Sequence, residues 1–307
     1  MKYLINMPEK GDTVEFEVNF PKVFLIEPVS KDVFMSATIV KIYVWKRTKY
    51  QEVAVVDVAG FGRSLIIDGF TQSTEVDEFI YHEALVHPAM VTHEEPKRVL
   101  IIGGGEGSVL REVLKHNTVK EAIMVDIDEE VIEIAKEYLE CMHKGSFFDK
   151  RAKIVISDGK EYIRRAQENY FDVVIIDLTD PYSSEVARGL YGRDFYKDVN
   201  RVLTNNGVMV TQAGNSFFYT EVYDWVLSNI KSVFPITREY SVWVPSFGYA
   251  CNFIIGSKSR DPMSLSKEDV DRVLRARGLK GKLKLYSGRT HIALLSMPIL
   301  RQGHSTS

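Results

Sequence analysis

Five acidic residues stand where apolar segments of this 307-residue chain end, and together they could bind a cationic ligand. They are Glu106, Asp126, Asp158, Asp177 and Asp180, and Gln212 occupies the equivalent place after the next segment. If the segments are parallel strands, their carboxyl ends meet at the edge of a sheet where α/β proteins bind ligands. A single aspartate at such a place is more often a helix N-cap or a turn residue. Five acids, with no lysine or arginine apparent nearby, favour a polycationic ligand.

Glu106 lies inside a glycine-rich turn, with Gly103 to Gly105 before it and Gly107 after it. Glycine lets the backbone approach a ligand because no Cβ intervenes. The order strand, glycine turn, helix and strand, with Asp126 about 20 residues later, is typical of a nucleotide-binding unit whose acid holds the ribose hydroxyls. A phosphate-binding turn should not carry an anion, and the P-loop ending Gly-Lys-Ser/Thr is missing. Glu106 therefore suggests an adenosine ligand with a cationic group, unless it only stabilises the start of the following helix.

Asp177 and Asp180 share one loop, in the sequence DLTDP. Pro181 biases Asp180 away from helical backbone and so favours a loop at the end of the strand. Two carboxylates in one loop could bind a single ammonium group.

His82 and His87 lie on a predicted helix that we expect to begin at Thr74, with Asp77 completing an approximate capping box, and to end near Pro88. A separation of five residues places the two histidines about 140° apart around the helix axis. Zinc-binding histidines of this kind are four residues apart and share one face. We therefore expect no metal and no cofactor.

The segments that carry these residues alternate between strand and helix. The unbroken apolar run from Val99 to Ile102 predicts a strand buried on both faces, and Val109 to Leu114 recur at helical spacing. Further strands are expected over residues 123–125, 153–156, 172–176 and 207–211, helices over 129–139, 162–167, 195–203 and 217–230, and antiparallel closing strands over 237–244 and 251–255. This alternation predicts a mostly parallel α/β sheet.

The first 75 residues are rich in β-branched and aromatic side chains, which predicts a small antiparallel β-domain. Ala59-Gly60 and Asp68-Gly69 mark its hairpin turns. We expect an N-terminal β-domain over residues 1–75, a catalytic domain over 76–300 and a tail over 301–307.

The composition excludes several classes of protein. A net charge of −3 argues against nucleic-acid binding. Two cysteines, Cys141 and Cys251, do not make a disulfide scaffold and fit a reducing compartment. The first residues lack the apolar stretch of a signal peptide, and no apolar run reaches membrane-spanning length. We expect a cytoplasmic protein without a membrane or nucleic-acid partner.

Four segments resemble those of the polyamine aminopropyltransferases, spermidine synthase and its relatives: GGGEGSVLREVLKH, MVDID, DVVIIDLTDP and TQSTEVDEFIYHEALVHPAM. The resemblance extends roughly from Trp45 to Met297. It implies a class I methyltransferase-like, Rossmann-like domain behind a β-domain that forms a homodimer or homotetramer. It also implies that an aminopropyl group moves from decarboxylated S-adenosylmethionine to an amine, with release of methylthioadenosine.

The same resemblance assigns roles to individual residues. It places the donor against Gln51, Gln72, Gly103, Gly105, Glu106, Asp126, Asp158 and Gly159. It makes Asp177 the proton acceptor and places the amine against Tyr81, His82, Asp180, Gln212 and Phe247. The residues themselves support one of these roles. A decarboxylated donor has an ammonium tail and no carboxylate, so Glu106 should attract it and disfavour ordinary S-adenosylmethionine.

Three departures from the family pattern concern the acceptor. Phe247 stands where putrescine-using members carry a tyrosine, Leu178 replaces a small residue, and Ser183-Ser184 replace a glycine-containing loop. These features are closer to thermospermine synthases and to agmatine or triamine aminopropyltransferases of thermophiles. We expect agmatine or a triamine such as spermidine to be used better than putrescine, with Glu185 available for a far charged group.

Two other functions remain alternatives. The first is an amine N-methyltransferase that uses intact S-adenosylmethionine, against which Glu106 argues. The second is a non-catalytic polyamine-binding protein, against which the complete set of acids around Asp177 argues.

Overall fold

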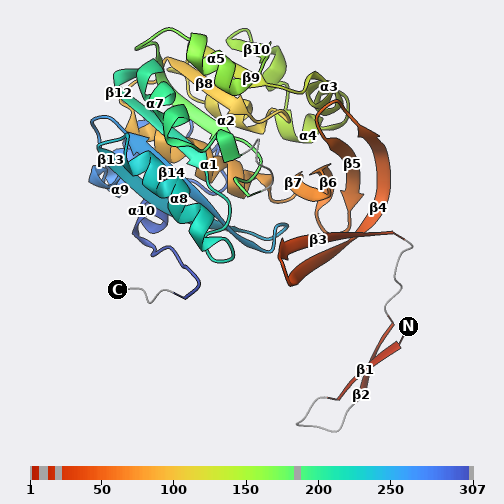
Figure 1. Cartoon of the computed structure of the whole chain (residues 1–307). Helices are drawn as coiled ribbons and strands as arrows, with labels where there is room; N and C mark the ends of the chain where they lie inside the picture. The colour runs from red at the N-terminus through yellow and green to blue at the C-terminus, as the bar shows by residue number, and fades with distance from the viewer. Residues whose placement is uncertain (1, 7–12, 18–22, 183–187, 304–307) are drawn as a thin grey trace.

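The structure is a computed structural model that describes residues 2–6, 13–17, 23–182 and 188–303. One seven-stranded sheet, with strand order β10-β9-β8-β11-β12-β14-β13, forms the centre of the molecule (Figure 1). Its strands are β8 (Arg98–Gly103), β9 (Glu121–Asp126), β10 (Ala152–Ile156), β11 (Phe171–Asp177), β12 (Leu203–Gln212), β13 (Ile236–Val244) and β14 (Tyr249–Ser257). The five strands from β10 to β12 are parallel, and β14 and β13 close the sheet antiparallel. The expected fold class, a mostly parallel Rossmann-like sheet, is confirmed.

Helices cover both faces of this sheet (Figure 1). They are α1 (Glu78–Thr92), α2 (Ser108–Leu114), α3 (Glu129–Tyr138), α4 (Glu140–His143), α5 (Gly159–Arg165), α7 (Arg193–Val202), α8 (Thr220–Lys231), α9 (Lys267–Ala276) and α10 (Gly288–Ser296). Val99 and Ile101 of β8 pack against α1, α2 and α3 on one face, whereas Leu100 and Ile102 pack against α5, α7 and α8 on the other. All four side chains are at most 1% exposed. A central strand buried on both faces needs an unbroken apolar run of this kind.

The N-terminal strands form a separate antiparallel sheet, as expected. Its order is β3 (Phe24–Ser30), β4 (Val33–Arg47), β5 (Glu52–Val58), β6 (Gly62–Ile67) and β7 (Phe70–Thr74). Val53, Val55, Leu65 and Ile67 from its inner face join the core around α1. A two-stranded hairpin of β1 (Lys2–Asn6) and β2 (Thr13–Glu17) lies away from the body of the molecule (Figure 1).

The boundaries predicted for the first helix were wrong at both ends. Helix α1 begins at Glu78, and Asp77 caps nothing with its side chain but accepts hydrogen bonds from Thr74 and Ser246 instead. Pro88 lies inside the helix, which continues to Thr92. A proline there leaves the carbonyl four residues earlier without its helical donor. That carbonyl, of Ala84, accepts a hydrogen bond of 2.8 Å from the buried Tyr240 hydroxyl, so tertiary structure replaces the lost bond.

Other element boundaries differ for local reasons. Helix α5 begins at Gly159 rather than Tyr162, because the Asp158 side chain accepts hydrogen bonds from two backbone amides of its first turn. Helix α8 begins at Thr220, because the Asn215 side chain accepts hydrogen bonds from the amides of Phe217 and Phe218 and so holds them in a turn. Helices α9 and α10 were not predicted. No helix among the described residues is long and apolar enough to cross a membrane.

Candidate active site

The glycine turn after β8 runs between two acidic strand ends. The amide of Gly104 donates a hydrogen bond of 3.0 Å to the carbonyl of Asp177. A Cβ added to Gly104 would lie 3.4 Å from Asp177 Oδ2, and one added to Gly105 would lie 2.9 Å from Asp126 Oδ2. A side chain at Gly105 would therefore crowd the carboxylate of Asp126, and one at Gly104 would touch that of Asp177. At Gly103 a Cβ would lie 2.1 Å from the Asp177 carbonyl, and its φ of 82° is left-handed, so glycine is required there.

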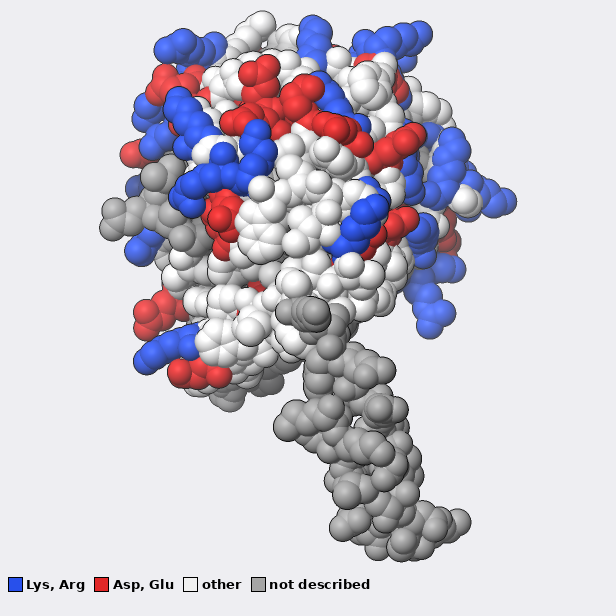
Figure 2. Space-filling view, turned by 90° about the vertical axis from the view of Figure 1, so that its right-hand side faces the viewer, with Lys and Arg blue, Asp and Glu red and all other residues white. Residues whose placement is uncertain are grey.

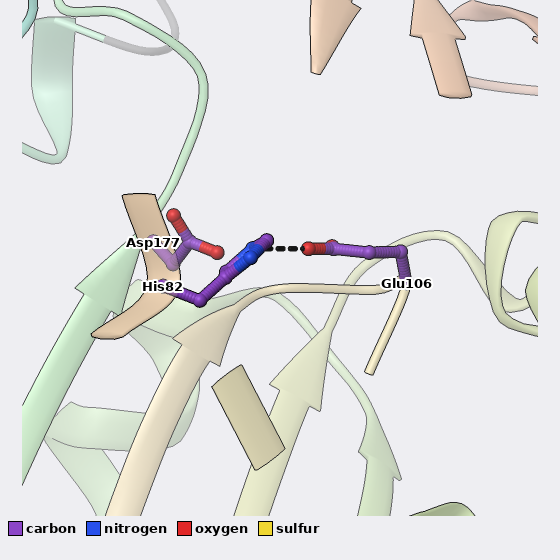
Figure 3. A group of neighbouring side chains, drawn as sticks. All are labelled: His82, Glu106 and Asp177. Atoms are coloured by element: carbon purple, nitrogen blue, oxygen red, sulfur yellow. Dashed lines mark hydrogen bonds and ion pairs between the residues drawn. The ribbon is translucent and has the colours of Figure 1, made fainter. Parts of the chain in front are cut away.

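Asp177 lies at the centre of this edge. The hydroxyl of Tyr81 donates a hydrogen bond of 2.7 Å to Asp177 Oδ1. One polar atom from each of His82, Glu106 and Asp177 lies within 4.8 Å of the others, although β11 is far from α1 in the sequence (Figure 3). Burial, and then the negative charge of Glu106, raise the pKa of Asp177 to about 7. The carboxyl is therefore shared between its charged and neutral forms at neutral pH.

His82 lies between two carboxylates. Its Nε2 is 2.8 Å from Glu106 Oε1, and its Nδ1 is 2.9 Å from Glu78 Oε2 (Figure 3 shows the bond to Glu106). Burial alone would lower the pKa of His82, but the hydrogen bonds to Glu106 and Glu78 raise it to about 10. The ring is therefore an imidazolium with both nitrogens donating. A metal ligand must be a neutral imidazole, so a metal ion here would have to displace a proton that two carboxylates hold on the ring.

His87, the other histidine of α1, contacts different residues. Nε2 of His87 is 3.1 Å from Glu112, and its Nδ1 is 3.1 Å from His116.

The residues expected at the donor are only partly brought together. Asp126 ends β9 beside the glycine turn, accepts a hydrogen bond of 2.9 Å from the amide of Asp128, and has its pKa raised to about 6 by burial. Gln51 donates a hydrogen bond of 3.1 Å to Asp128, which places the loop before β5 next to this strand end. Within the part of the chain that the structure describes, the Gln72 side chain bonds only to the carbonyl of Phe70, at 3.2 Å. Asp158 is an exposed cap of α5, the role that a single aspartate at such a position most often has.

Gly159 allows close packing of a helix on the sheet. A Cβ added there would lie 2.5 Å from Ile102.

The residues expected at the amine surround the loop after β11. Gln212 donates hydrogen bonds to the carbonyl of Leu178 at 2.5 Å and to the hydroxyl of Tyr191 at 2.8 Å. Burial raises the pKa of Asp180, although hydrogen bonds with Tyr182 and Gln212 oppose the rise. Phe247 is 7% exposed, and its ring packs edge-on against Tyr81 with centroids 6.0 Å apart.

Several residues of this region were not anticipated. They are Glu78, Arg111, Tyr182, Tyr191 and Tyr249. Tyr182 follows Pro181 directly and stacks on Tyr219 with ring centroids 3.7 Å apart, so its position after the DLTDP motif was an available signal. Glu78 and Arg111 lie in two motifs that had been noted, but nothing in a single sequence indicates that these motifs meet.

Comparison with known proteins identifies the family. The model of the spermine/spermidine synthase domain matches residues 78–267. The chain is 55% identical over 282 residues to the polyamine aminopropyltransferase of Pyrobaculum neutrophilum, covering 91% of this chain and 96% of that protein. The corresponding protein of Pyrobaculum aerophilum is 52% identical over the same shares. The chain belongs to the spermine/spermidine synthase family.

Solved structures of this family have the same fold. A spermidine synthase in complex with the transition-state analogue AdoDATO has a TM-score of 0.85 and 34% sequence identity, covering 93% of this chain and 96% of that one. The spermidine synthase of Thermotoga maritima has a TM-score of 0.83 and also 34% identity, over 93% and 95%. The family expected from the four sequence motifs is thus confirmed.

The raised pKa of Asp177 predicts a pH-dependent effect of Asp177→Asn on stability. A carboxyl whose pKa is higher in the folded than in the unfolded protein makes folding less favourable as the pH rises from its unfolded value to about 7. The asparagine variant should therefore become more stable than the wild type over this range, by up to about 4 kcal/mol at pH 8. Free energies of unfolding from guanidinium titrations at pH 4.5 and pH 8 measure the difference, and an equal difference at both pH values would contradict the assigned shift.

Proposed function

We propose that the acidic edge around Glu106, Asp126, Asp177 and Asp180 is the active site for aminopropyl transfer. As a member of the spermine/spermidine synthase family, the chain is a transferase of polyamine biosynthesis, as its motifs predicted. The observation that carries the proposal is the contact between Asp177, held by Tyr81, and the paired Glu106 and His82 beside the glycine turn. It provides a proton acceptor and a site for a cation next to a nucleotide-binding turn.

The proposed donor is decarboxylated S-adenosylmethionine. Its adenosine would lie on the glycine turn, with the ribose on Asp126 and the adenine near Asp158 and Gly159. Its ammonium tail would lie against Glu106, with Gln51 and Gln72 on the same side. The donor carries two positive charges, a sulfonium and an ammonium, and both would meet buried carboxylates. The positive charges of such a ligand would stabilise the charged forms of Asp126 and Asp177, whose pKa values are raised first by burial and then by neighbouring carboxylates.

In the proposed mechanism Asp177 orients the amine and accepts its proton as the C–N bond forms. An alkylammonium has a pKa near 10.4, so transfer to an ordinary aspartate would be uphill by roughly 9 kcal/mol. A pKa of about 7 for Asp177 reduces this to roughly 5 kcal/mol. The nearby sulfonium would lower the pKa of the amine and the pKa of Asp177, so the difference between them would remain unfavourable for proton transfer before the reaction. The proton therefore moves as the C–N bond forms, because the amine nitrogen becomes more acidic at that point. Tyr81, His82, Asp180 and Gln212 would define the line of approach.

The acceptor is proposed to be agmatine or a triamine in preference to putrescine. Phe247 packs on Tyr81, which itself bonds to Asp177. Its ring is therefore connected through Tyr81 to the carboxylate at which the reacting amine is proposed to bind. A phenyl ring offers an apolar wall or a cation–π contact of about 0.5–2 kcal/mol, but no hydrogen bond to the far ammonium of a short diamine. Ser183, Ser184 and Glu185, which the sequence also connects with acceptor choice, lie outside the described residues.

We further propose that residues 1–75 mediate assembly into a homodimer or homotetramer. Several apolar side chains on the outer surface of β3 and β4 are exposed, among them Ile26 (65%), Phe34 (62%) and Val40 (67%). Figure 2 shows a broad area without charged side chains on the side of the molecule where this sheet lies. An apolar area of this kind is typical of an interaction surface.

Asp177→Asn should keep donor binding but lower turnover by roughly two to four orders of magnitude, the usual contribution of a positioned acid–base group. Steady-state release of methylthioadenosine measures turnover. The wild type is tested with both intact and decarboxylated S-adenosylmethionine and a panel of amines, and S-adenosylhomocysteine as the product would indicate a methyltransferase instead. Turnover of the variant close to that of the wild type would rule out the role of Asp177.

Competition between equimolar putrescine, agmatine and spermidine should give putrescine the lowest specificity constant. Phe247→Tyr should shift the preference towards putrescine by about threefold to tenfold, since a factor of ten corresponds to about 1.4 kcal/mol. Phe148→Tyr, at a ring that is 73% exposed, is the matched control and should shift nothing. A specificity constant highest for putrescine in the wild type would contradict the proposed acceptor.

A further inference from the structure

A series of buried side chains with alternating charges extends from Glu106 into the protein. Its members, in order, are Glu106, His82, Glu78, Arg111, Glu112 and Lys115. Arg111 Nη2 lies 2.7 Å from Glu78 Oε2, and its Nε lies 2.8 Å from Glu112 Oε1. Lys115 lies 2.7 Å from the same oxygen of Glu112. Only the last member, Lys115, approaches the surface, because the other five are at most 7% exposed.

The first four members connect two elements at two points. Glu78 and His82 are one turn apart on α1. Glu106 and Arg111 belong to the glycine turn and to the helix α2 that follows it. The pair His82–Glu106 and the pair Glu78–Arg111 therefore tie the glycine turn and α2 to α1. Because Glu78 bonds both to His82 and to Arg111, it couples the two ties.

Stability alone is a weak reason for this arrangement. Buried ion pairs contribute little over well-packed apolar residues, because each charge loses its hydration. Burial would raise the pKa of Glu78, but hydrogen bonds from His82 and Arg111 lower it to about 2, so it remains charged. This series of buried charges begins at Glu106, the carboxylate that the proposed function places against the donor's ammonium.

We propose that Glu78 and Arg111 are positioning residues that act through His82 to orient Glu106 and thereby determine selectivity for a donor with an ammonium tail. This inference rests on the proposed function. His82 holds Glu106 Oε1, which fixes the carboxylate and would leave its other oxygen for the donor's ammonium. Arg111 compensates the charge of Glu78, and Glu78 holds the second ring nitrogen of His82. The backbone carbonyl of Glu78, 2.8 Å from Nδ1, would still accept a hydrogen bond from the ring, but without the Glu78 carboxylate the imidazolium would hold its proton less tightly, and its pairing with Glu106 would weaken.

Three adenosine ligands distinguish an effect on recognition of the ammonium tail from an effect on the binding of adenosine ligands in general. Decarboxylated S-adenosylmethionine carries a sulfonium and an ammonium, the 5′-dimethylsulfonium of adenosine carries the sulfonium alone, and methylthioadenosine carries neither charge. In Glu78→Gln and Arg111→Met the dissociation constant measured by calorimetry should rise about tenfold or more for the first ligand and less than threefold for the other two. Arg111→Lys, which keeps the charge, should restore most of the loss. Nitrogen NMR of labelled histidine should show that the imidazolium signal of His82 at pH 8 is lost in Glu78→Gln.

Arg151→Met is the matched control. Arg151 binds Asp149 and the carbonyl of Leu114, at 2.8 and 2.7 Å, and its described bonds involve neither Glu78 nor His82. It should leave the ratio of the three constants unchanged. Equal losses for all three ligands in Glu78→Gln and Arg111→Met, no recovery in Arg111→Lys, or an unchanged His82 signal in Glu78→Gln would overturn the proposal. A wild type that does not bind decarboxylated S-adenosylmethionine would instead contradict the proposed function and the inference with it, which distinguishes that failure from one seen only in the variants.

Discussion

Several carboxyl groups are buried together at the carboxyl edge of one parallel sheet, and the cost of burying their charges, to which repulsion between them adds, is the constraint on which the site depends. Asp177 and Asp126 respond by holding protons near neutral pH, with pKa values of about 7 and 6. Glu106 responds by pairing with the His82 imidazolium. Protons on Asp177 and Asp126, and the imidazolium of His82 beside Glu106, thus neutralise negative charge at an edge where a dicationic donor would also do so. A ligand with positive charges at these positions would stabilise the charged forms of the buried carboxyl groups and displace their protons.

The fold produces this edge by topology. Parallel pairing of β9, β8, β11 and β12 brings together strand ends as far apart in the sequence as Gly103 and Gln212, and apolar runs in these strands leave polar side chains mainly at their ends. The glycine turn then allows the backbone to pass between Asp126 and Asp177 without a side chain covering either. Helix α1 supplies Tyr81 and His82 from the side, and the packing of the N-terminal sheet on this helix helps to hold it.

Much of this could be predicted because the signals are local. The strand that ends at Gly103, the turn around Glu106 and the acids at the ends of β9 and β11 follow from runs and spacings within a few residues. The parts that failed depend on distant partners. Pro88 was expected to end its helix, but Tyr240, more than 150 residues away, replaces the missing hydrogen bond. The tie between Glu78 and Arg111 joins two motifs whose contact one sequence cannot indicate.

The number of protons released on donor binding tests whether the donor's positive charges replace the protons on the buried carboxyl groups. Calorimetric titrations at pH 7 in buffers of different ionisation enthalpy count the protons exchanged when decarboxylated S-adenosylmethionine binds without an acceptor. Because Asp177 is about half protonated at pH 7 and Asp126 less so, we expect release of roughly half a proton. Uncharged methylthioadenosine should release none. Equal release by both ligands, or none by the donor, would show that the buried carboxyl groups are not what the donor's charges engage.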